Sequence, residues 1–173
     1  MSQILFKPVG EIEKIVAYAD AGFCNLPDGS SSTQGFAIFL EGNKDSCILD
    51  WGSVKIRRKV ASTLEAETLA LKETINNAIY LGNLLSEFLF NDFKVNRINV
   101  EAYCDNKPVE QSIRSSKQAH EKRLRVDVGE IQRLLEDREI VDVKWIPTEL
   151  QLADGLTKRD VPMEGLMTRI SSK

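Results

Sequence analysis

The chain has 173 residues, which suits a single domain, and its composition of 42% apolar and 28% charged residues is that of an ordinary soluble globular protein. It has no run approaching the roughly 20 apolar residues of a membrane helix and no secretory signal, so we expect an intracellular protein without membrane contacts. The three cysteines are far apart and form no C-x-x-C pair, which argues against a disulfide framework and a structural zinc site. The net charge of −3 excludes a protein that holds nucleic acid by bulk charge alone.

Three strands are predicted in the first third of the chain. Residues 15–19 form a continuous apolar run that ends at Asp20, as in a central strand buried on both faces. Residues 35–40 and 47–54 are typical of two further strands, and the turn-forming residues 41–45 between them indicate a hairpin. We therefore expect these strands to form an antiparallel meander.

Helices and strands alternate in the rest of the chain. Ser62 and Glu65 match the capping box of a helix start, and apolar residues follow at helical spacing as far as Gly82, where we predict a break before a short helix over 84–90. The later elements are, in order, a strand over 98–104, a short helix opening at 106–108, a helix over 118–137, a strand over 140–146 and a short helix over 151–157. The expected order is βββαβαβ, which is an α/β fold.

Three aspartates follow or end predicted strands. Asp20 ends the most apolar strand, and Asp105 ends the strand over 98–104. In open α/β sheets ligands gather beyond the strand ends, so these two carboxylates come together if their strands are adjacent and parallel. Asp154 lies among apolar residues shortly after the last strand, and it is the third candidate for the same site.

A glutamate on the first helix is a fourth candidate. At about 100° per residue from Leu64, Leu71 and Ile75 lie within about 20° of the core direction. Glu67 lies at about −60°, on the edge of this apolar stripe, whereas Glu65 lies at about +100° and already has a role in the capping box. Glu67 is therefore the better candidate for a site.

Converging carboxylates need a cation to offset their mutual repulsion and the cost of desolvation. An all-oxygen ligand set favours the hard ions Mg²⁺ or Mn²⁺, which leave coordination positions for water and phosphate. The single histidine, His120, and the unpaired cysteines offer no competing zinc or Cys–His chemistry. No G-x-x-x-x-G-K-[ST] loop supports hydrolysis of nucleoside triphosphates.

Four short motifs carry a resemblance to a known family. They are Tyr18-Ala19-Asp20, Glu65-Ala66-Glu67-Thr68-Leu69-Ala70-Leu71, Tyr103-Cys104-Asp105-Asn106 and Leu152-Ala153-Asp154-Gly155-Leu156-Thr157-Lys158. In this order and spacing they resemble the ribonuclease H domain of copia-type LTR retrotransposon polyproteins. The resemblance spans residues 15–158, with 1–14 as an N-terminal lead-in and 159–173 as a C-terminal tail. It implies a ribonuclease H-like fold, a five-stranded mixed sheet of three antiparallel and then parallel strands flanked by helices.

The resemblance also implies an activity. In the family the acidic residues of these motifs bind two Mg²⁺ ions, or Mn²⁺; here they are Asp20, Glu67, Asp105 and Asp154. The implied reaction is hydrolysis of the RNA strand of RNA–DNA hybrids during reverse transcription, with 5′-phosphate products. A reverse transcriptase domain N-terminal to this domain in a polyprotein is the implied partner. A cytoplasmic virus-like particle or the nucleus is the implied location.

One departure from the family leaves alternatives open. Many relatives carry a histidine loop before the last aspartate, whereas residues 147–151 contain no histidine. The proton transfer or product release that this histidine assists then falls to Glu149 or to water, or is less efficient. We therefore expect weak activity in isolation. The first alternative is a non-catalytic docking module of a reverse transcriptase or of a domesticated protein. The second is another Mg²⁺-dependent α/β protein, such as a phosphotransfer or phosphatase domain, which three leading antiparallel strands disfavour.

Two groups of basic residues flank the candidate metal site, and we expect them to contact phosphates without reading base sequence. The predicted nucleic-acid-binding residues are Lys55, Arg57, Arg58, Lys59, Asn106, Arg114, Lys117, Lys122, Arg123 and Arg125. Trp51 and Trp145 lie within predicted strands and are expected in the core. His120 is expected on the surface.

Overall fold

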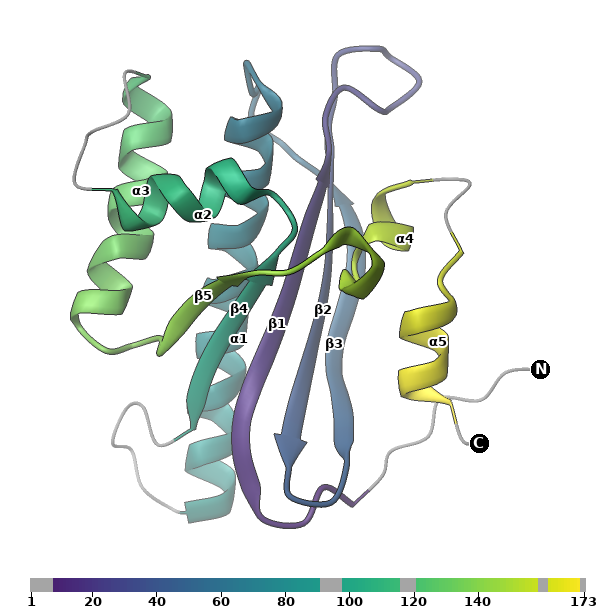
Figure 1. Ribbon diagram of the computed structural model, residues 1–173, viewed down its shortest axis with the longest axis vertical. Coiled ribbons are helices and arrows are strands. Elements are labelled where there is room, and N and C mark those ends of the chain that lie inside the picture. Colours follow the sequence, from purple (N-terminus) through teal and green to yellow (C-terminus); the bar gives the residue numbers. More distant parts are fainter. Residues whose placement is uncertain (1–7, 91–97, 116–120, 159–161, 172–173) are drawn as a thin grey trace.

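A computed structural model describes residues 8–90, 98–115, 121–158 and 162–171 of the chain. Its elements are β1 (Ile12–Gly22), β2 (Thr33–Gly42), β3 (Ser46–Lys55), α1 (Thr63–Phe90), β4 (Asn99–Cys104), α2 (Lys107–Arg114), α3 (Lys122–Glu136), β5 (Asp142–Trp145), the 3₁₀ turn η1 (Thr148–Leu150), α4 (Asp154–Thr157) and α5 (Glu164–Ile170). The five strands form one sheet in the order β3-β2-β1-β4-β5 (Figure 1). β1 to β3 are antiparallel, and β1, β4 and β5 are parallel, so the expected mixed sheet is confirmed.

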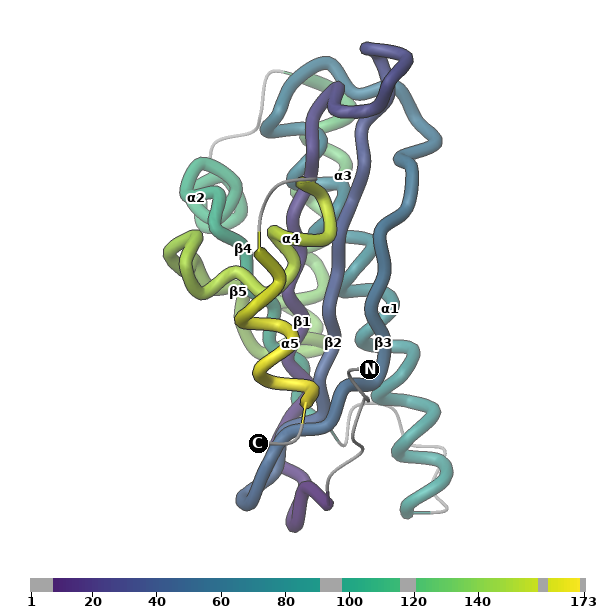
Figure 2. The backbone as a smooth tube through the Cα atoms, turned by 90° about the vertical axis from the view of Figure 1, so that its right-hand side faces the viewer, coloured from purple at the N-terminus to yellow at the C-terminus, as the bar shows by residue number. Residues whose placement is uncertain are grey.

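The central strand β1 separates two apolar clusters, because successive side chains of a strand point to opposite faces. Ile15 and Ala17 belong to the cluster that α1, α2 and α3 cover. Val16 and Tyr18 belong to the cluster on the other face, together with residues of α5 and of the segment around α4. Figure 2 shows the sheet between α1 on one side and α5 on the other. The prediction of a central strand buried on both faces is confirmed.

Helix α1 begins with the predicted capping box. The backbone N–H of Glu65 donates to Ser62 Oγ at 3.1 Å, and the Glu65 carboxylate accepts from the backbone N–H of Ala61 at 2.7 Å. The first bond satisfies an N–H group that the helix start leaves without an intrahelical partner, and the second attaches the carboxylate to the residue just before Ser62. Although α1 has 28 residues, neither it nor any other helix in the described ranges is long and apolar enough to cross a membrane.

The predicted break at Gly82 is wrong, since α1 continues without interruption to Phe90. Gly82 is buried where the helix crosses the sheet: a Cβ there would lie 3.3 Å from Ile15 Cδ1 and 3.9 Å from Val100 Cγ2. The glycine therefore permits close packing of helix on sheet. This tertiary contact outweighs the helix propensity of about 1 kcal/mol that glycine forfeits relative to alanine.

Residues 164–170, which the sequence places in a tail, form α5. Leu166 and Ile170 are buried against the sheet. Arg169 donates to the Tyr18 hydroxyl at 2.8 Å and forms an ion pair with Glu41, so both an apolar face and a polar clamp attach the helix. Helix α5 is thus part of the folded core.

The expectation that both tryptophans lie in the core is wrong. Trp51 is 41% exposed and Trp145 is 43% exposed. They lie on β3 and β5, the two edge strands of the sheet, where helices cover the strands less completely than they cover β1. The indole N–H of Trp145 donates to the backbone carbonyl of Asp105 at 2.9 Å, which satisfies its polar end.

Candidate active site

Parallel pairing of β1 with β4 brings two of the predicted aspartates together. The register places Tyr18 opposite Tyr103, so Asp20 and Asp105, each two residues further on, lie side by side at the carboxyl end of β4. Asp20 is 2% exposed, and Asp105 is half-buried. The condition that the sequence set for their convergence, adjacent and parallel strands, is therefore met.

The third aspartate, Asp154, reaches the site because α4 lies directly on the sheet. A Cβ at Gly35 of β2 would come within 2.8 Å of Thr157 Cγ2, so only glycine allows this approach without displacing the helix. The buried side chain of Gln151 donates to the carbonyl of Ala19 at 2.9 Å and attaches the start of the segment to β1. Asp154 is the first residue of α4 and is buried.

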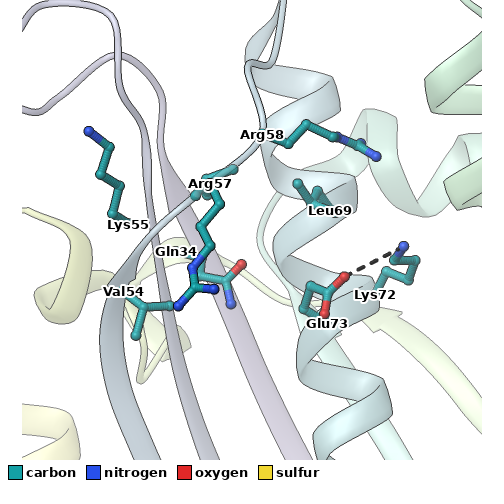
Figure 3. A pocket seen from close by; sticks show the side chains of 9 residues that line it. Gln34, Val54, Lys55, Arg57, Arg58, Leu69, Lys72 and Glu73 are labelled. Atoms are coloured by element: carbon teal, nitrogen blue, oxygen red, sulfur yellow. Dashed lines mark ion pairs between the residues drawn. The ribbon is translucent and has the colours of Figure 1, made fainter.

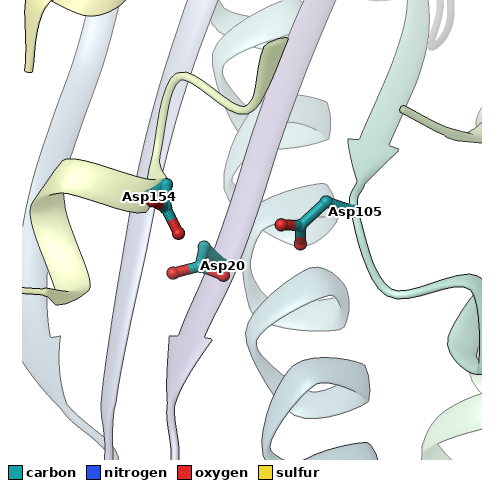
Figure 4. A group of neighbouring side chains, drawn as sticks. All are labelled: Asp20, Asp105 and Asp154. Atoms are coloured by element: carbon teal, nitrogen blue, oxygen red, sulfur yellow. The ribbon is translucent and has the colours of Figure 1, made fainter. Parts of the chain in front are cut away.

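The three aspartates point toward one another from β1, from the end of β4 and from α4 (Figure 4). One carboxylate oxygen of each lies within 4.8 Å of the others. Threonine hydroxyls orient two of them: Thr157 donates to Asp20, and Thr148 donates to Asp105 Oδ2 at 2.9 Å. The hydroxyls satisfy one oxygen of each carboxylate and leave other lone pairs for a ligand.

Glu67, the fourth predicted ligand, lies beside this group on α1 but is not among the carboxylates within 4.8 Å of one another. It is 7% exposed, as the helical wheel predicts for a residue beside the core stripe. Burial raises the pKa of Glu67 to about 9, and the charges of Asp20 and Asp105 contribute, although the backbone N–H of Ala21 opposes them. The pKa of Asp20 is also raised, chiefly by burial and against the hydrogen bond from Thr157. The charge of Lys158 lowers both pKa values but does not cancel these shifts, so negative charge is only partly compensated at this site.

Sequence reasoning did not assign a role to Lys158, although it lies in the fourth motif. Its ammonium forms an ion pair with Asp154, at the i, i+4 spacing typical of helical pairs. Burial alone would lower the pKa of Lys158, but the hydrogen bond to Asp154 and the charges of Asp20 and Asp105 raise it above its ordinary value. The helical spacing of the two residues was the available signal.

The donor set fits a hard divalent cation. Carboxylate and hydroxyl oxygens are the ligands on offer, and mutual distances under 4.8 Å allow one ion to bridge the three aspartates. The raised pKa values of Asp20 and Glu67 also favour a cation at this site. Repulsion between neighbouring carboxylates contributes to both shifts, and a bound cation would relieve it.

Arg58, predicted to contact phosphates, lies in a buried charge network instead. Its guanidinium pairs with Asp127 and lies 3.6 Å from Glu65 Oε1. Lys72 donates to the other oxygen of Asp127 at 3.0 Å. Burial alone would raise the pKa of Asp127, but the hydrogen bonds from Arg58 and Lys72 lower it. This network joins residues 55–59, between β3 and α1, to α1 and α3.

The other basic side chains between positions 55 and 59 are exposed. Lys55 pairs with Asp28 at 3.2 Å, and Arg57 and Lys59 are exposed. Arg57 lines an open pocket of about 470 Å³, together with Gln34, Val54, Lys55, Ile56, Arg58, Leu69, Lys72 and Glu73. Figure 3 shows the Arg57 side chain directed toward Gln34 and Val54, whereas Arg58 points away from them. No ion pair of Arg57 is found among the described residues.

The second group of basic residues includes both side chains with partners in the chain and exposed side chains. Arg114 is held by Glu110 and by Asp142, at 2.9 Å, and Arg123 donates to the carbonyl of Lys59 at 3.3 Å. Lys122 and Arg125 are exposed on α3, and Lys117, like His120, lies outside the described residues. Asn106 caps α2, since its side chain accepts from the backbone N–H of Val109.

No protein-family model matches the chain. Among solved structures, LC11-RNase H1 from a compost metagenome is 20% identical, with a TM-score of 0.58 over 83% of this chain and 92% of that one. The N-terminal RNase H domain of Rv2228c from Mycobacterium tuberculosis is 18% identical, with a TM-score of 0.57 over 84% of this chain and 91% of that one. The prototype foamy virus protease–reverse transcriptase is 17% identical, with a TM-score of 0.52 over 94% of this chain but only 23% of that one. The chain therefore has a ribonuclease H-like fold, as the sequence predicts.

Proposed function

We propose that this protein is a metal-dependent endonuclease that hydrolyses the RNA strand of RNA–DNA hybrids. The observation that carries the proposal is the convergence of Asp20, Asp105 and Asp154, bordered by Glu67, at the carboxyl end of β4 in a ribonuclease H-like fold. LC11-RNase H1, which shares this fold, has also been solved in complex with an RNA/DNA hybrid.

The residues divide the work of such a site. Two divalent ions, Mg²⁺ or Mn²⁺, would activate a water molecule and stabilise the leaving 3′-oxygen, which yields 5′-phosphate products without a protein nucleophile. The three aspartates and Glu67 would hold these ions. Thr148 and Thr157 fix the orientation of their carboxylate partners. Arg57 and Lys59, exposed beside the start of α1, would position the phosphate backbone.

The wider setting is part of the same proposal. Four motifs in order and spacing support an origin in a copia-type retrotransposon polyprotein, with a reverse transcriptase domain as partner. The foamy virus relative of the fold is a protease–reverse transcriptase. A place inside the cell, in a virus-like particle or the nucleus, accords with that origin.

The test is cleavage of a labelled RNA–DNA hybrid by the purified chain in Mg²⁺. We expect cleavage of the hybrid RNA strand but not of single-stranded RNA, duplex RNA or duplex DNA. A chelator should abolish cleavage and excess Mg²⁺ should restore it. Absence of hybrid cleavage at stoichiometric enzyme and saturating metal would refute the proposal.

The non-catalytic alternative has one observation in its favour. Tyr80, Leu84 and Phe88 are 64%, 37% and 80% exposed, and their spacing puts them on one face of α1. An exposed apolar stripe is typical of a protein interface. A chain that binds divalent ions but leaves every hybrid intact would favour docking on a reverse transcriptase over catalysis.

A further inference from the structure

A protein cation already occupies part of the carboxylate site. Lys158 Nζ pairs with Asp154 Oδ1, and its charge also acts on Asp20 and Asp105. The Asp154 side chain is 8% exposed and that of Lys158 is 47% exposed, so the lysine reaches the buried acids from the solvent side. Lys158 and a divalent ion would therefore compete for the same oxygen.

Lys158 can leave this position without disturbing the fold. It is the C-cap of α4, with an extended backbone (φ −115°, ψ 133°), and its backbone N–H donates to the Asp154 carbonyl at 3.3 Å. The backbone bond keeps the residue in place. The side chain itself is a flexible four-carbon stem that carries a compact point charge.

The charges of the site indicate where the Lys158 side chain would move. The four carboxylates carry up to four negative charges, which two divalent ions would balance. The positive charge of Lys158 then has no partner among the neutralised acids, whereas an arriving phosphodiester brings one negative charge. A lysine displaced from Asp154 is thus complementary to the scissile phosphate.

We propose that Lys158 is a mobile cation of the active site. It neutralises Asp154 in the metal-free protein, leaves that carboxylate when divalent ions bind, and then contacts a non-bridging oxygen of the scissile phosphate. The second half rests on the proposed hybrid-cleaving function, whereas the competition with metal does not.

The first measurement is calorimetric titration of the metal-free protein with Mn²⁺ alone. Replacing Lys158 by methionine, which keeps the length of the stem, removes the competing charge and should tighten binding on the order of tenfold. Lys158→Arg should bind Mn²⁺ as the wild type does. Lys44→Met, which removes an exposed lysine from the β2–β3 turn, is the matched control and should bind as the wild type does. Unchanged or weaker binding in Lys158→Met would overturn the proposal.

The second measurement concerns the substrate. In Ca²⁺, whose looser coordination disfavours the catalytic geometry, the affinity of Lys158→Met for the hybrid should fall several-fold. In saturating Mg²⁺ its single-turnover cleavage should fall about tenfold or more, and Lys158→Arg should recover part of the loss. Tighter metal binding with slower cleavage is a signature that a merely misfolded variant would not give.

The two possible failures are distinguishable. A wild type that cleaves the hybrid, with an unchanged rate in Lys158→Met, overturns only the role of the lysine. A wild type that neither binds nor cleaves the hybrid overturns the proposed function and the substrate contact together. In that case the Mn²⁺ titration still decides whether Lys158 competes with metal.

Discussion

Glu65 and Glu67 stand two residues apart on α1, and both are buried, yet they face opposite electrostatic surroundings. Glu65 closes the capping box and lies beside Arg58, which in turn pairs with Asp127. Glu67 faces Asp20 and Asp105, and its pKa is raised to about 9. Burial alone therefore does not mark a candidate functional carboxylate; negative charge that nearby cations compensate only in part does.

The same contrast separates the two buried aspartates at the centre of each group. Cations lower the pKa of Asp127 and hold it ionised, whereas burial and neighbouring carboxylates raise the pKa of Asp20. The network around Asp127 therefore stabilises the fold, and the cluster around Asp20 stores repulsion that a metal ion would relieve. Removing a charge should have opposite consequences in the two regions.

The largest effect is expected for Asp105→Asn, which keeps the shape of the side chain but removes its charge. Cleavage of the hybrid should fall at least about a thousandfold, which corresponds to about 4 kcal/mol in the activation barrier. The free energy of unfolding of the metal-free protein, measured in urea, should be unchanged or higher because repulsion is relieved. Cleavage comparable to that of the wild type would exclude Asp105 from the catalytic site.

Asp127→Asn tests the other region. It leaves Arg58 and Lys72 without their shared charged partner. We expect the free energy of unfolding to fall by about 3 kcal/mol. This is the lower end of the range for a broken buried ion pair, because Arg58 is partly exposed. Urea denaturation measures this change. Hybrid cleavage by the folded fraction should persist, since Asp127 pairs with Arg58 and Lys72 and is not part of the group of three aspartates. A loss of activity without a loss of stability would reverse the assignment of the two regions.

The pH dependence of stability follows from Glu67. An unfolded glutamate has a pKa of about 4.3, and the folded pKa of Glu67 is about 9, so the fold favours the protonated form. As far as this group is concerned, the metal-free protein should be most stable below about pH 4.3. It should lose several kcal/mol of stability, at about 1.4 kcal/mol per pKa unit, as the pH rises toward 9. Urea denaturation at a series of pH values measures the decline.

Two variants on one helix sharpen this prediction. Glu67→Gln should remove most of the decline with pH, because the titrating group is gone. Glu65→Gln is the matched control: it removes a charge two residues away, a glutamine still closes the capping box, and the decline should remain. Identical pH profiles in both variants would show that Glu67 is not the group responsible.

The sequence predicted what depends on local pattern. The order of strands and helices along the chain, the antiparallel pairing of the first three strands and the candidacy of Asp20 and Asp105 follow from apolar runs and from where they end. The mixed sheet itself was implied by the family resemblance. The capping box was recognisable because its two residues are three apart. The position of Glu67 followed from the helical period.

What the sequence could not predict depends on contacts between distant segments. The partner of Arg58 is 69 residues away, and Thr157 meets Asp20 across 137 residues. Gly82 was misread because its local preference is to end a helix, whereas packing against Ile15 decides its place. A basic residue near a site therefore cannot be assigned to nucleic acid until the neighbouring acids are known.

The smallest predicted effect concerns the salt dependence of hybrid binding. Arg57 is exposed, whereas Arg58 is bound to Asp127, although the two are adjacent in the sequence. Each phosphate neutralised on a B-form duplex contributes about −0.9 to the slope of log affinity against log salt, and for a hybrid only the order of magnitude transfers. Arg57→Ala should therefore flatten the slope by about one unit and weaken binding to every sequence alike. Arg58→Ala should leave the slope unchanged and lower the stability of the fold by about 1–2 kcal/mol. Equal changes of slope in the two variants would show that Arg58 exchanges Asp127 for phosphate when the hybrid binds.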